Sequence, residues 1–144
     1  MTAIIILNWN GADDTIECLE SLYAAQGQFF VVLADNGSAD DSVSRIQTWA
    51  VAHGVHHRRA ERGSVITTPP DDRDLIVVPM RENLGFARGN NAALECLKPV
   101  TPDYVLLLNN DTLVEPDFLV RLTDFMQEHP HYVALTPQIR YNAE

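Results

Sequence analysis

The sequence predicts an α/β protein, built as a mostly parallel sheet flanked by helices. Short apolar runs alternate with amphipathic helical patterns along its 144 residues. These runs are continuous rather than alternating, which is typical of strands that are covered on both faces. Several of them pass directly into polar residues. Right-handed crossovers would bring those strand ends to one edge of the sheet, where we expect a ligand site.

Apolar runs and helical spacing place the elements in the order strand, helix, strand, helix. The predicted strands cover residues 3–7, 29–34, 75–78, 104–108 and 132–136. The run 104–108 is expected to be fully buried. Asp13 and Asp14 are suited to cap the first helix, and Ser38 with Asp41 resembles a capping pair for the second. Residues 52–74 have no sustained period, so we expect a long irregular connection there.

Length and composition indicate one domain, residues 1–144, with 46% apolar and 21% charged residues. No apolar run approaches the roughly 20 residues of a membrane span, and the first residues lack the features of a signal peptide. We therefore expect a cytoplasmic protein. Cys18 and Cys96 fall within apolar helical patterns, which favours buried free thiols over a disulfide. The formal charge of −10 disfavours nucleic acid as a partner.

Four polar clusters would share the predicted edge of the sheet: residues 8–11, 35–38, 83–88 and 109–112. Asp111 is a hard oxygen donor, and Mg²⁺ or Mn²⁺ held by one carboxylate commonly completes its shell with water and ligand phosphates. Residues 109–112 would equally serve as a turn and helix cap. Asp35 could accept hydrogen bonds from a nucleobase or ribose, although residues 35–38 also make a good turn before a helix.

Other candidate ligands have simpler interpretations. Arg88 and Arg81 could contact phosphate, but a solvated surface arginine is the commoner case. His53, His56 and His57 lie in the irregular stretch without a cysteine or carboxylate at ligand spacing, so they are treated as loop residues. Trp9 is expected to be a packing residue that also lines the cleft.

Five motifs in order resemble family 2 glycosyltransferases of the GT-A fold, and within them the rhamnosyltransferase-like branch. The motifs are I-I-I-L-N-W-N-G at 4–11, E-C-L-E-S-L at 17–22, A-D-N-G-S-A-D at 34–40, N-L-G-F-A-R-G-N-N-A-A-L at 83–94 and L-L-N-N-D-T at 107–112. The resemblance spans nearly the whole chain. It implies a nucleotide-sugar-binding part of a transferase acting in polysaccharide biosynthesis.

The resemblance implies transfer of a sugar, with inversion, from a UDP- or dTDP-linked donor to the hydroxyl of a glycan or lipid-linked acceptor. Mg²⁺ or Mn²⁺ would assist, and the cytosolic face of a membrane is a further expected location. Asp35 matches the residue that reads the base, and Asn8 lies in the first loop of the nucleotide pocket. The ribose and diphosphate side would be lined by Asn83, Gly85 and Arg88. The D-x-D position is matched by Asn109, Asn110 and Asp111, with Asp111 as the metal ligand.

The sequence departs from the family pattern in two respects. Asn109 replaces the first acid of D-x-D, which leaves one carboxylate for the metal and would loosen cation dependence or shift the donor. The general base of the family normally follows the fifth strand, and the sequence ends at Glu144 before such a segment. The catalytic base is therefore unassigned. We therefore expect the donor-binding half of a transferase, either as a truncated chain or as a naturally short protein. A donor-binding module without turnover and a homodimer formed through exposed apolar surface are further expectations.

Three other α/β classes are alternatives to a transferase. A receiver-like signalling domain needs a lysine after a late strand, whereas the only lysine, Lys98, precedes the fourth predicted strand. A dinucleotide-binding fold would carry G-x-G-x-x-G after a strand, and a P-loop protein would carry G-x-x-x-x-G-K-[ST]. Neither motif is present. The sequence therefore favours the transferase over all three classes.

Overall fold

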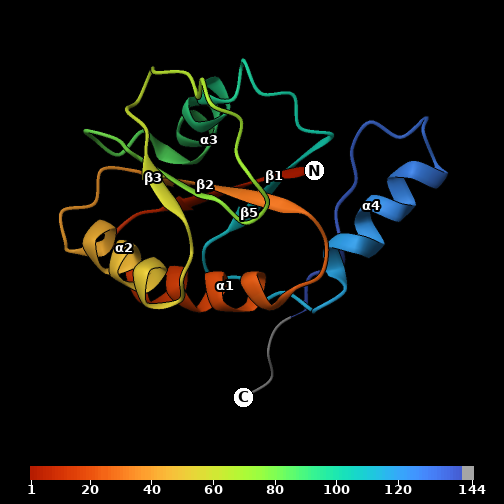
Figure 1. The fold of residues 1–144 in the computed structure, drawn as a ribbon, viewed down its shortest axis with the longest axis horizontal. Helices are drawn as coiled ribbons and strands as arrows, with labels where there is room; N and C mark the ends of the chain where they lie inside the picture. The colour runs from red at the N-terminus through yellow and green to blue at the C-terminus, as the bar shows by residue number, and fades with distance from the viewer. Residues whose placement is uncertain (141–144) are drawn as a thin grey trace.

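A computed structural model describes residues 1–140, and within them it places a five-stranded sheet and four helices (Figure 1). The elements are β1 (Thr2–Asn8), α1 (Ala12–Ala24), β2 (Phe29–Asp35), α2 (Ser42–Ala52), β3 (His57–Arg59), β4 (Leu75–Pro79), α3 (Gly85–Cys96), β5 (Tyr104–Asn109) and α4 (Phe118–Glu128). The predicted α/β class is confirmed. In residues 1–140 no helix has the length and apolar character needed to cross a membrane.

All strands of the sheet run parallel in the order β3-β4-β2-β1-β5. β1 lies between β2 and β5, so that Asn8 pairs with Asp35 on one side and Leu7 pairs with Asn109 on the other. The strands β2, β3 and β4 all lie on one side of β1, and β5, the last strand in the sequence, lies on its other side. The strand order therefore reverses between β1 and β5, and ligands of such sheets bind beyond the strand ends at this reversal.

The helices form layers on both faces of the sheet. In Figure 1, α1 and α2 lie on one side of the strands and α3 on the other. Ile4 and Ile6 pack with the α1 and α2 residues, whereas Ala3 and Ile5 pack with α3. Because both faces of the central strands are covered, their sequences are continuously apolar. This explains why the runs in β1, β2 and β4 could be recognised.

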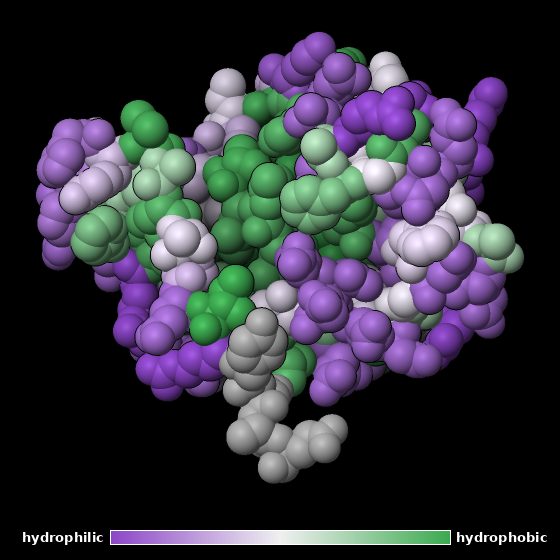
Figure 2. Space-filling model, turned by 180° about the vertical axis from the view of Figure 1, so that it is seen from behind, coloured by the Kyte–Doolittle hydropathy of each residue, from purple (hydrophilic) through white to green (hydrophobic). Residues whose placement is uncertain are grey.

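The strand β5 is less buried than its sequence predicts, which corrects the expectation of a fully buried run. It pairs only with β1 and forms an edge of the sheet. Val105 and Leu107 are 46% and 48% exposed, whereas Leu106 and Leu108 are partly buried against the α1 side. From behind, Figure 2 shows apolar side chains gathered in the middle of the surface. Among residues 1–140, no element covers β5 on the α3 side as completely as the central strands are covered.

Two expectations about irregular segments also need correction. The connection 52–74 contains β3, a polar three-residue strand that forms because its backbone pairs with β4. The predicted strand at 132–136 is wrong, since residues 129–140 contain no strand. The backbone turns there, with Tyr132 N donating to His129 O, and Val133 is 96% exposed. A short apolar run becomes a strand only where it reaches a partner edge.

The helix starts differ from the predicted caps. Gly11 occupies the N-cap of α1, and Asp13 and Asp14 lie in its first turn, where they still interact favourably with the helix dipole. Ser38 does not cap α2, because its hydroxyl is bound to Asp35. Cys18 and Cys96 are buried and free, as predicted.

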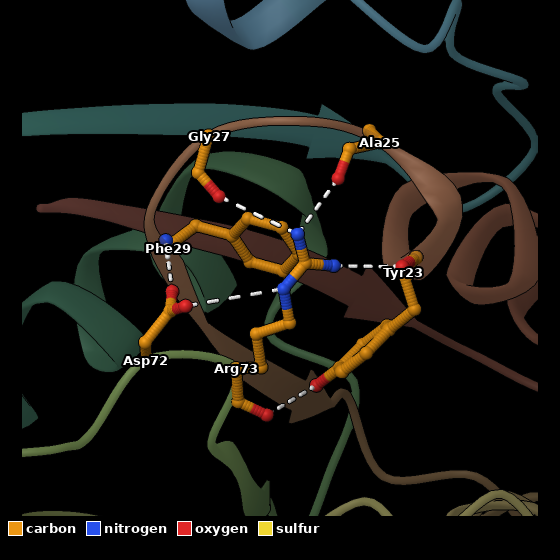
Figure 3. A network of polar contacts seen from close by, with 6 residues as sticks. All are labelled: Tyr23, Ala25, Gly27, Phe29, Asp72 and Arg73. Carbon is orange, nitrogen blue, oxygen red and sulfur yellow. Dashed lines mark hydrogen bonds and ion pairs between the residues drawn. The ribbon is translucent and has the colours of Figure 1, made fainter.

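At the amino-terminal ends of the strands, Arg73 stabilises the turn between α1 and β2 through hydrogen bonds (Figure 3). Its guanidinium donates to the carbonyls of Tyr23 at 2.7 Å and Ala25 at 2.8 Å, with a longer contact to Gly27 at 3.5 Å. The group also lies 4.7 Å from the ring centroid of Phe29. Arg73 has a φ of +66°, a strained value for a residue with a side chain. This partly buried arginine has a structural role and lies at the edge of the sheet opposite the carboxyl ends of the strands.

Candidate functional site

The carboxyl ends of β1 and β2 meet in a hydrogen-bonded group centred on Asp35. Asn8 Nδ2 donates to Asp35 Oδ1 at 2.7 Å and to Ser38 Oγ at 3.1 Å. Ser38 donates to the same carboxylate twice, through Oγ at 2.6 Å and through its backbone N at 3.1 Å. Asp35 is only 3% exposed. The buried carboxylate is thus stabilised by hydrogen bonds from neutral donors, which a carboxylate inside a protein requires.

The predicted role of Asp35 as a direct reader of a base stays a prediction. The structure shows a carboxylate that orders the turn at residues 36–38. Both oxygens accept protein hydrogen bonds, and the backbone carbonyl of Asp35 accepts a further bond of 2.7 Å from Met80 N. Asp35 therefore joins β1, β2 and the end of β4 at one point.

Thr15 connects this group to the end of β5. Its hydroxyl donates to Asn8 Oδ1 at 2.8 Å and accepts from Asn110 Nδ2 at 3.0 Å. Gly11 lies against the same amide, since a Cβ at Gly11 would stand 3.1 Å from Asn110 Nδ2. The clusters at 8–11, 35–38 and 109–112 are thus joined by a continuous line of side chains. The sequence does not point to Thr15, because a threonine within the first turns of a helix carries no distinctive signal.

The fourth cluster joins through Asn36, which is buried. Its Nδ2 donates to Asn83 Oδ1 at 2.9 Å, and its Oδ1 accepts from Leu84 N at 2.9 Å. Gly37, with a φ of +75°, lies so close to the loop before α3 that a Cβ there would stand 2.5 Å from the carbonyl carbon of Glu82. All four predicted clusters therefore share one edge.

Gly85 and Arg88 lie at the start of α3. Gly85 has a φ of +75° and nothing within 4 Å of an added Cβ, so the backbone is open on that side. Arg88 Nε donates to Leu84 O at 3.1 Å, and this is its only hydrogen bond to residues 1–140. Its exposed guanidinium therefore keeps donors for a ligand. Arg81 is exposed as well.

Asp111 is exposed in the turn that follows β5. Among residues 1–140, no group of three or more His, Cys, Asp or Glu side chains could hold a metal ion. These residues do not enclose a cation by protein alone, and the carboxylate of Asp111 could hold one only together with water and ligand oxygens.

Cys18 lies beside Asp111 and remains a neutral thiol. Burial raises the pKa of Cys18 to about 11, a hydrogen bond with the backbone of Thr112 opposes this, and the charge of Asp111 adds to the rise. A thiolate ligand for the metal is thereby disfavoured at neutral pH.

Two aromatic side chains near this edge are exposed. Trp9, which directly follows Asn8, is 56% exposed, and Phe86 on the first turn of α3 is 61% exposed. The expectation that Trp9 is a packing residue is wrong, because the chain turns away from the sheet at Asn10, which has a φ of +50°.

The reversal of strand order and the joined polar clusters define an α/β protein whose candidate ligand site lies beyond its strand ends. The family described as "Glycosyl transferase family 2" matches residues 3–144. The chain belongs to this family. No curated protein sequence matches it.

Several solved structures share the fold. Over 95% of this chain, TarS 1-349 of S. aureus is 19% identical with a TM-score of 0.66, and a longer TarS structure is 20% identical over 90% with a TM-score of 0.64. The mannosyltransferase PcManGT from Pyrobaculum calidifontis, in complex with GDP-Man and Mn²⁺, is 23% identical over 87% with a TM-score of 0.67. The chain spans 38%, 20% and 32% of these three chains, respectively.

Proposed function

We propose that this family 2 domain binds a nucleoside diphosphate sugar and transfers the sugar, with inversion, to an acceptor hydroxyl. The observation that carries the proposal is the line of hydrogen-bonded side chains from Asn110 through Thr15 and Asn8 to Asp35. It crosses the sheet where the strand order reverses, and it can serve the two ends of one elongated ligand.

Each end of this line has a proposed role. The nucleoside end is formed by Asn8 and Asp35. The ribose and diphosphate side is formed by Asn83, Gly85, Arg88, Asn109 and Asn110, and the metal ligand is Asp111. Support comes from the solved mannosyltransferase, whose complex contains GDP-Man and Mn²⁺. A diphosphate approaching a protein of net charge −10 would be repelled without a cation, and Arg88 adds a positive charge on the same side.

In this proposal Mg²⁺ or Mn²⁺ supplies electrostatic stabilisation of the departing nucleoside diphosphate. Asp111 would hold the cation with water and diphosphate oxygens, while Arg88 donates to the diphosphate. The group that removes the acceptor proton is not assigned. The proposed acceptor is a glycan or lipid-linked hydroxyl, reached in the cytoplasm or at the cytosolic face of a membrane, and the proposed donors are UDP- or dTDP-linked, including a rhamnosyl donor.

Calorimetric titration with UDP, dTDP and GDP, each with and without Mn²⁺, tests donor binding. Wild-type protein is expected to bind at least one diphosphate more tightly with Mn²⁺. Asp111→Asn should weaken this Mn²⁺-dependent binding by about tenfold or more, equivalent to about 1.4 kcal/mol. Asp124→Asn, an exposed acid on α4, is the matched control and should bind like wild type. Equal binding by Asp111→Asn and wild type would count against the metal assignment.

A donor-binding module without turnover is the second candidate. It rests on the lack of an assigned base for the acceptor, and among residues 1–140 no group of three or more His, Cys, Asp or Glu side chains includes Asp111. Release of nucleoside diphosphate from a sugar donor, measured with and without an acceptor extract, separates the two. Acceptor-dependent release identifies a transferase, whereas tight binding without release identifies the module.

A homodimer is the remaining proposal about partners. Val105 and Leu107 expose an apolar strip on the edge strand β5, and strand edges of this kind pair readily with another chain. Light scattering over a range of concentrations is expected to show a dimer. A monomer at all concentrations, or a dimer unaffected by Leu107→Lys, would exclude this interface.

A further inference from the structure

One face of α1 carries a row of short side chains that contacts the chain just after β5. Thr15, Cys18 and Ser21 are spaced three residues apart, so they lie on the same side of the helix. The chain they contact is the post-β5 segment, residues 109–114. This segment begins at the last residue of β5, and beyond residue 109 it forms neither a helix nor a strand.

Each of these side chains binds a different part of the post-β5 segment. Thr15 Oγ1 accepts a bond of 3.0 Å from the side chain of Asn110. Cys18 Sγ donates to Asn109 O at 3.6 Å. Ser21 Oγ accepts from Val114 N at 3.2 Å.

The remaining contacts show how closely the two stretches run together. Gly11 provides the space for Asn110, as its added Cβ would stand 3.1 Å from the amide nitrogen. Beyond the end of α1, Gln26 N donates to Pro116 O at 2.7 Å. The segment therefore contacts α1 from its N-cap, Gly11, to Ser21, and the chain beyond the segment stays close at Gln26.

These contacts matter because the backbone N–H and C=O groups of an irregular segment need hydrogen-bond partners other than a neighbouring strand. Asp111 is exposed and makes no hydrogen bond or ion pair with another of residues 1–140. The position of its carboxylate is therefore set by the residues on either side. Asn109 and Asn110 are held before it, and Val114 is held after it.

We propose that Thr15, Cys18 and Ser21 are positioning residues that hold the post-β5 segment, and with it Asp111, where a cation and diphosphate can be bound. The inference rests on the proposed function of Asp111. None of the three side chains touches the ligand in this arrangement. They act through Asn109, Asn110 and Val114.

Ser21→Ala and Ser44→Ala form the central pair of variants. Ser21 Oγ donates to Cys18 O at 2.8 Å and accepts from Val114 N, whereas Ser44 Oγ makes the same kind of backbone bond, to Asp41 O at 2.8 Å, on α2. Both changes remove one hydroxyl from a helix, but only the first releases the post-β5 segment. Thr15→Val and Thr15→Ser form a second pair, in which only Val lacks the hydroxyl.

Hydrogen exchange followed by mass spectrometry gives the first readout, and it needs no ligand. Ser21→Ala should exchange faster than wild type in peptides that cover residues 109–116, while Ser44→Ala should match wild type there. Unchanged exchange in Ser21→Ala would show that α1 does not hold the segment, and would overturn the inference.

The second readout is the ratio of diphosphate affinities with and without Mn²⁺. Loss of one hydrogen bond to the segment should lower this ratio by roughly 3- to 10-fold in Ser21→Ala and Thr15→Val. Ser21→Ala should bind the free nucleoside as wild type does, because its contacts are remote from Asn8 and Asp35. A general structural defect would instead weaken nucleoside binding as well, and that outcome would overturn the positioning role.

The two readouts separate this inference from the proposed function. If wild-type protein binds none of the diphosphates, the proposed function fails, and hydrogen exchange still decides whether α1 holds the segment. If wild type binds with Mn²⁺ and both Ser21→Ala and Thr15→Val keep the full Mn²⁺ effect, the function stands and the positioning role is wrong. Should Thr15→Val fold poorly, the partly exposed Ser21 carries the test.

Discussion

The side-chain amide of Asn8 donates a hydrogen bond of 2.7 Å to the buried carboxylate of Asp35, across paired positions of β1 and β2. The pair combines one neutral donor with one charged acceptor. Such a combination keeps a carboxylate satisfied away from water without a cation beside it. Asn8 also forms hydrogen bonds with Thr15 and Ser38, so it connects β1 with α1 and with the turn after β2.

Asn8→Asp is expected to destabilise the protein by about 2 kcal/mol or more at pH 7, because it places two buried carboxylates side by side. The loss should shrink as the pH falls from 7 toward about 4, because the crowded pair takes up a proton more readily than the same carboxylates in the unfolded chain. Urea unfolding at both pH values measures the effect. Asn10→Asp is the control, since Asn10 is exposed and its Oδ1 only accepts from Ala39 N. Equal stability of the two variants at pH 7 would contradict the buried pairing.

Gly37→Ala should lower stability more than Gly54→Ala. Both glycines have positive φ values, +75° and +67°, so either alanine incurs roughly 1–2 kcal/mol of backbone strain. Only Gly37 is also crowded, with an added Cβ 2.5 Å from backbone, while nothing lies within 4 Å at Gly54. We expect a further cost of about 1–3 kcal/mol at Gly37. Equal shifts in the urea midpoint would mean that the loop before α3 does not approach Gly37 closely.

Arg73→Lys should destabilise the protein by about 1–3 kcal/mol, although it keeps the charge. A lysine lacks the planar fork that reaches the carbonyls of Tyr23 and Ala25 together. Nucleotide binding, measured as above, should be unchanged, since Arg73 lies at the opposite edge of the sheet. The control is Arg62→Lys, because within the described part of the chain Arg62 forms a single exposed ion pair, 4.0 Å long, with Glu82. A loss of binding without a loss of stability would contradict the structural role.

Cys18 should make stability depend on pH above 9. Its pKa rises from 9.0 in the unfolded chain to about 11 in the folded protein, so the folded state retains the proton more strongly. This contribution is present below pH 9 and is lost as the pH rises toward 11, by up to about 2–3 kcal/mol. Cys18→Ala should therefore show a shallower decline than wild type. Parallel declines in urea unfolding between pH 8 and 11 would contradict the assignment.

The interior strands could be predicted from sequence because burial on both faces leaves a continuous apolar run, as in Ile4 to Ile6. Burial of β5 could not be predicted in this way. Val105 and Leu107 resemble the interior residues in sequence, yet whether they are covered depends on an element elsewhere in the chain. Likewise, the polar β3 exists only because β4 offers it an edge.

The candidate site could likewise be predicted from the sequence only in part. Asn8, Asp35 and Asn110 could be placed together because each follows an apolar strand of a parallel sheet. Thr15 could not be found, since its importance comes from the packing of α1 against the end of β5. The direct ligand contacts of Asp35 and Asp111 remain predictions, which the titrations test.

The open edge of β5 has a practical consequence for handling the protein. Residues 104–108 include no proline or charged side chain, the usual devices that keep sheet edges apart. Mutual repulsion between molecules of charge −10 is then the main force opposing edge-to-edge stacking. Strong salt, or acid near the isoelectric point of about 4.7, would weaken that repulsion. Dilute buffer at neutral or mildly alkaline pH should therefore keep preparations clear for longest.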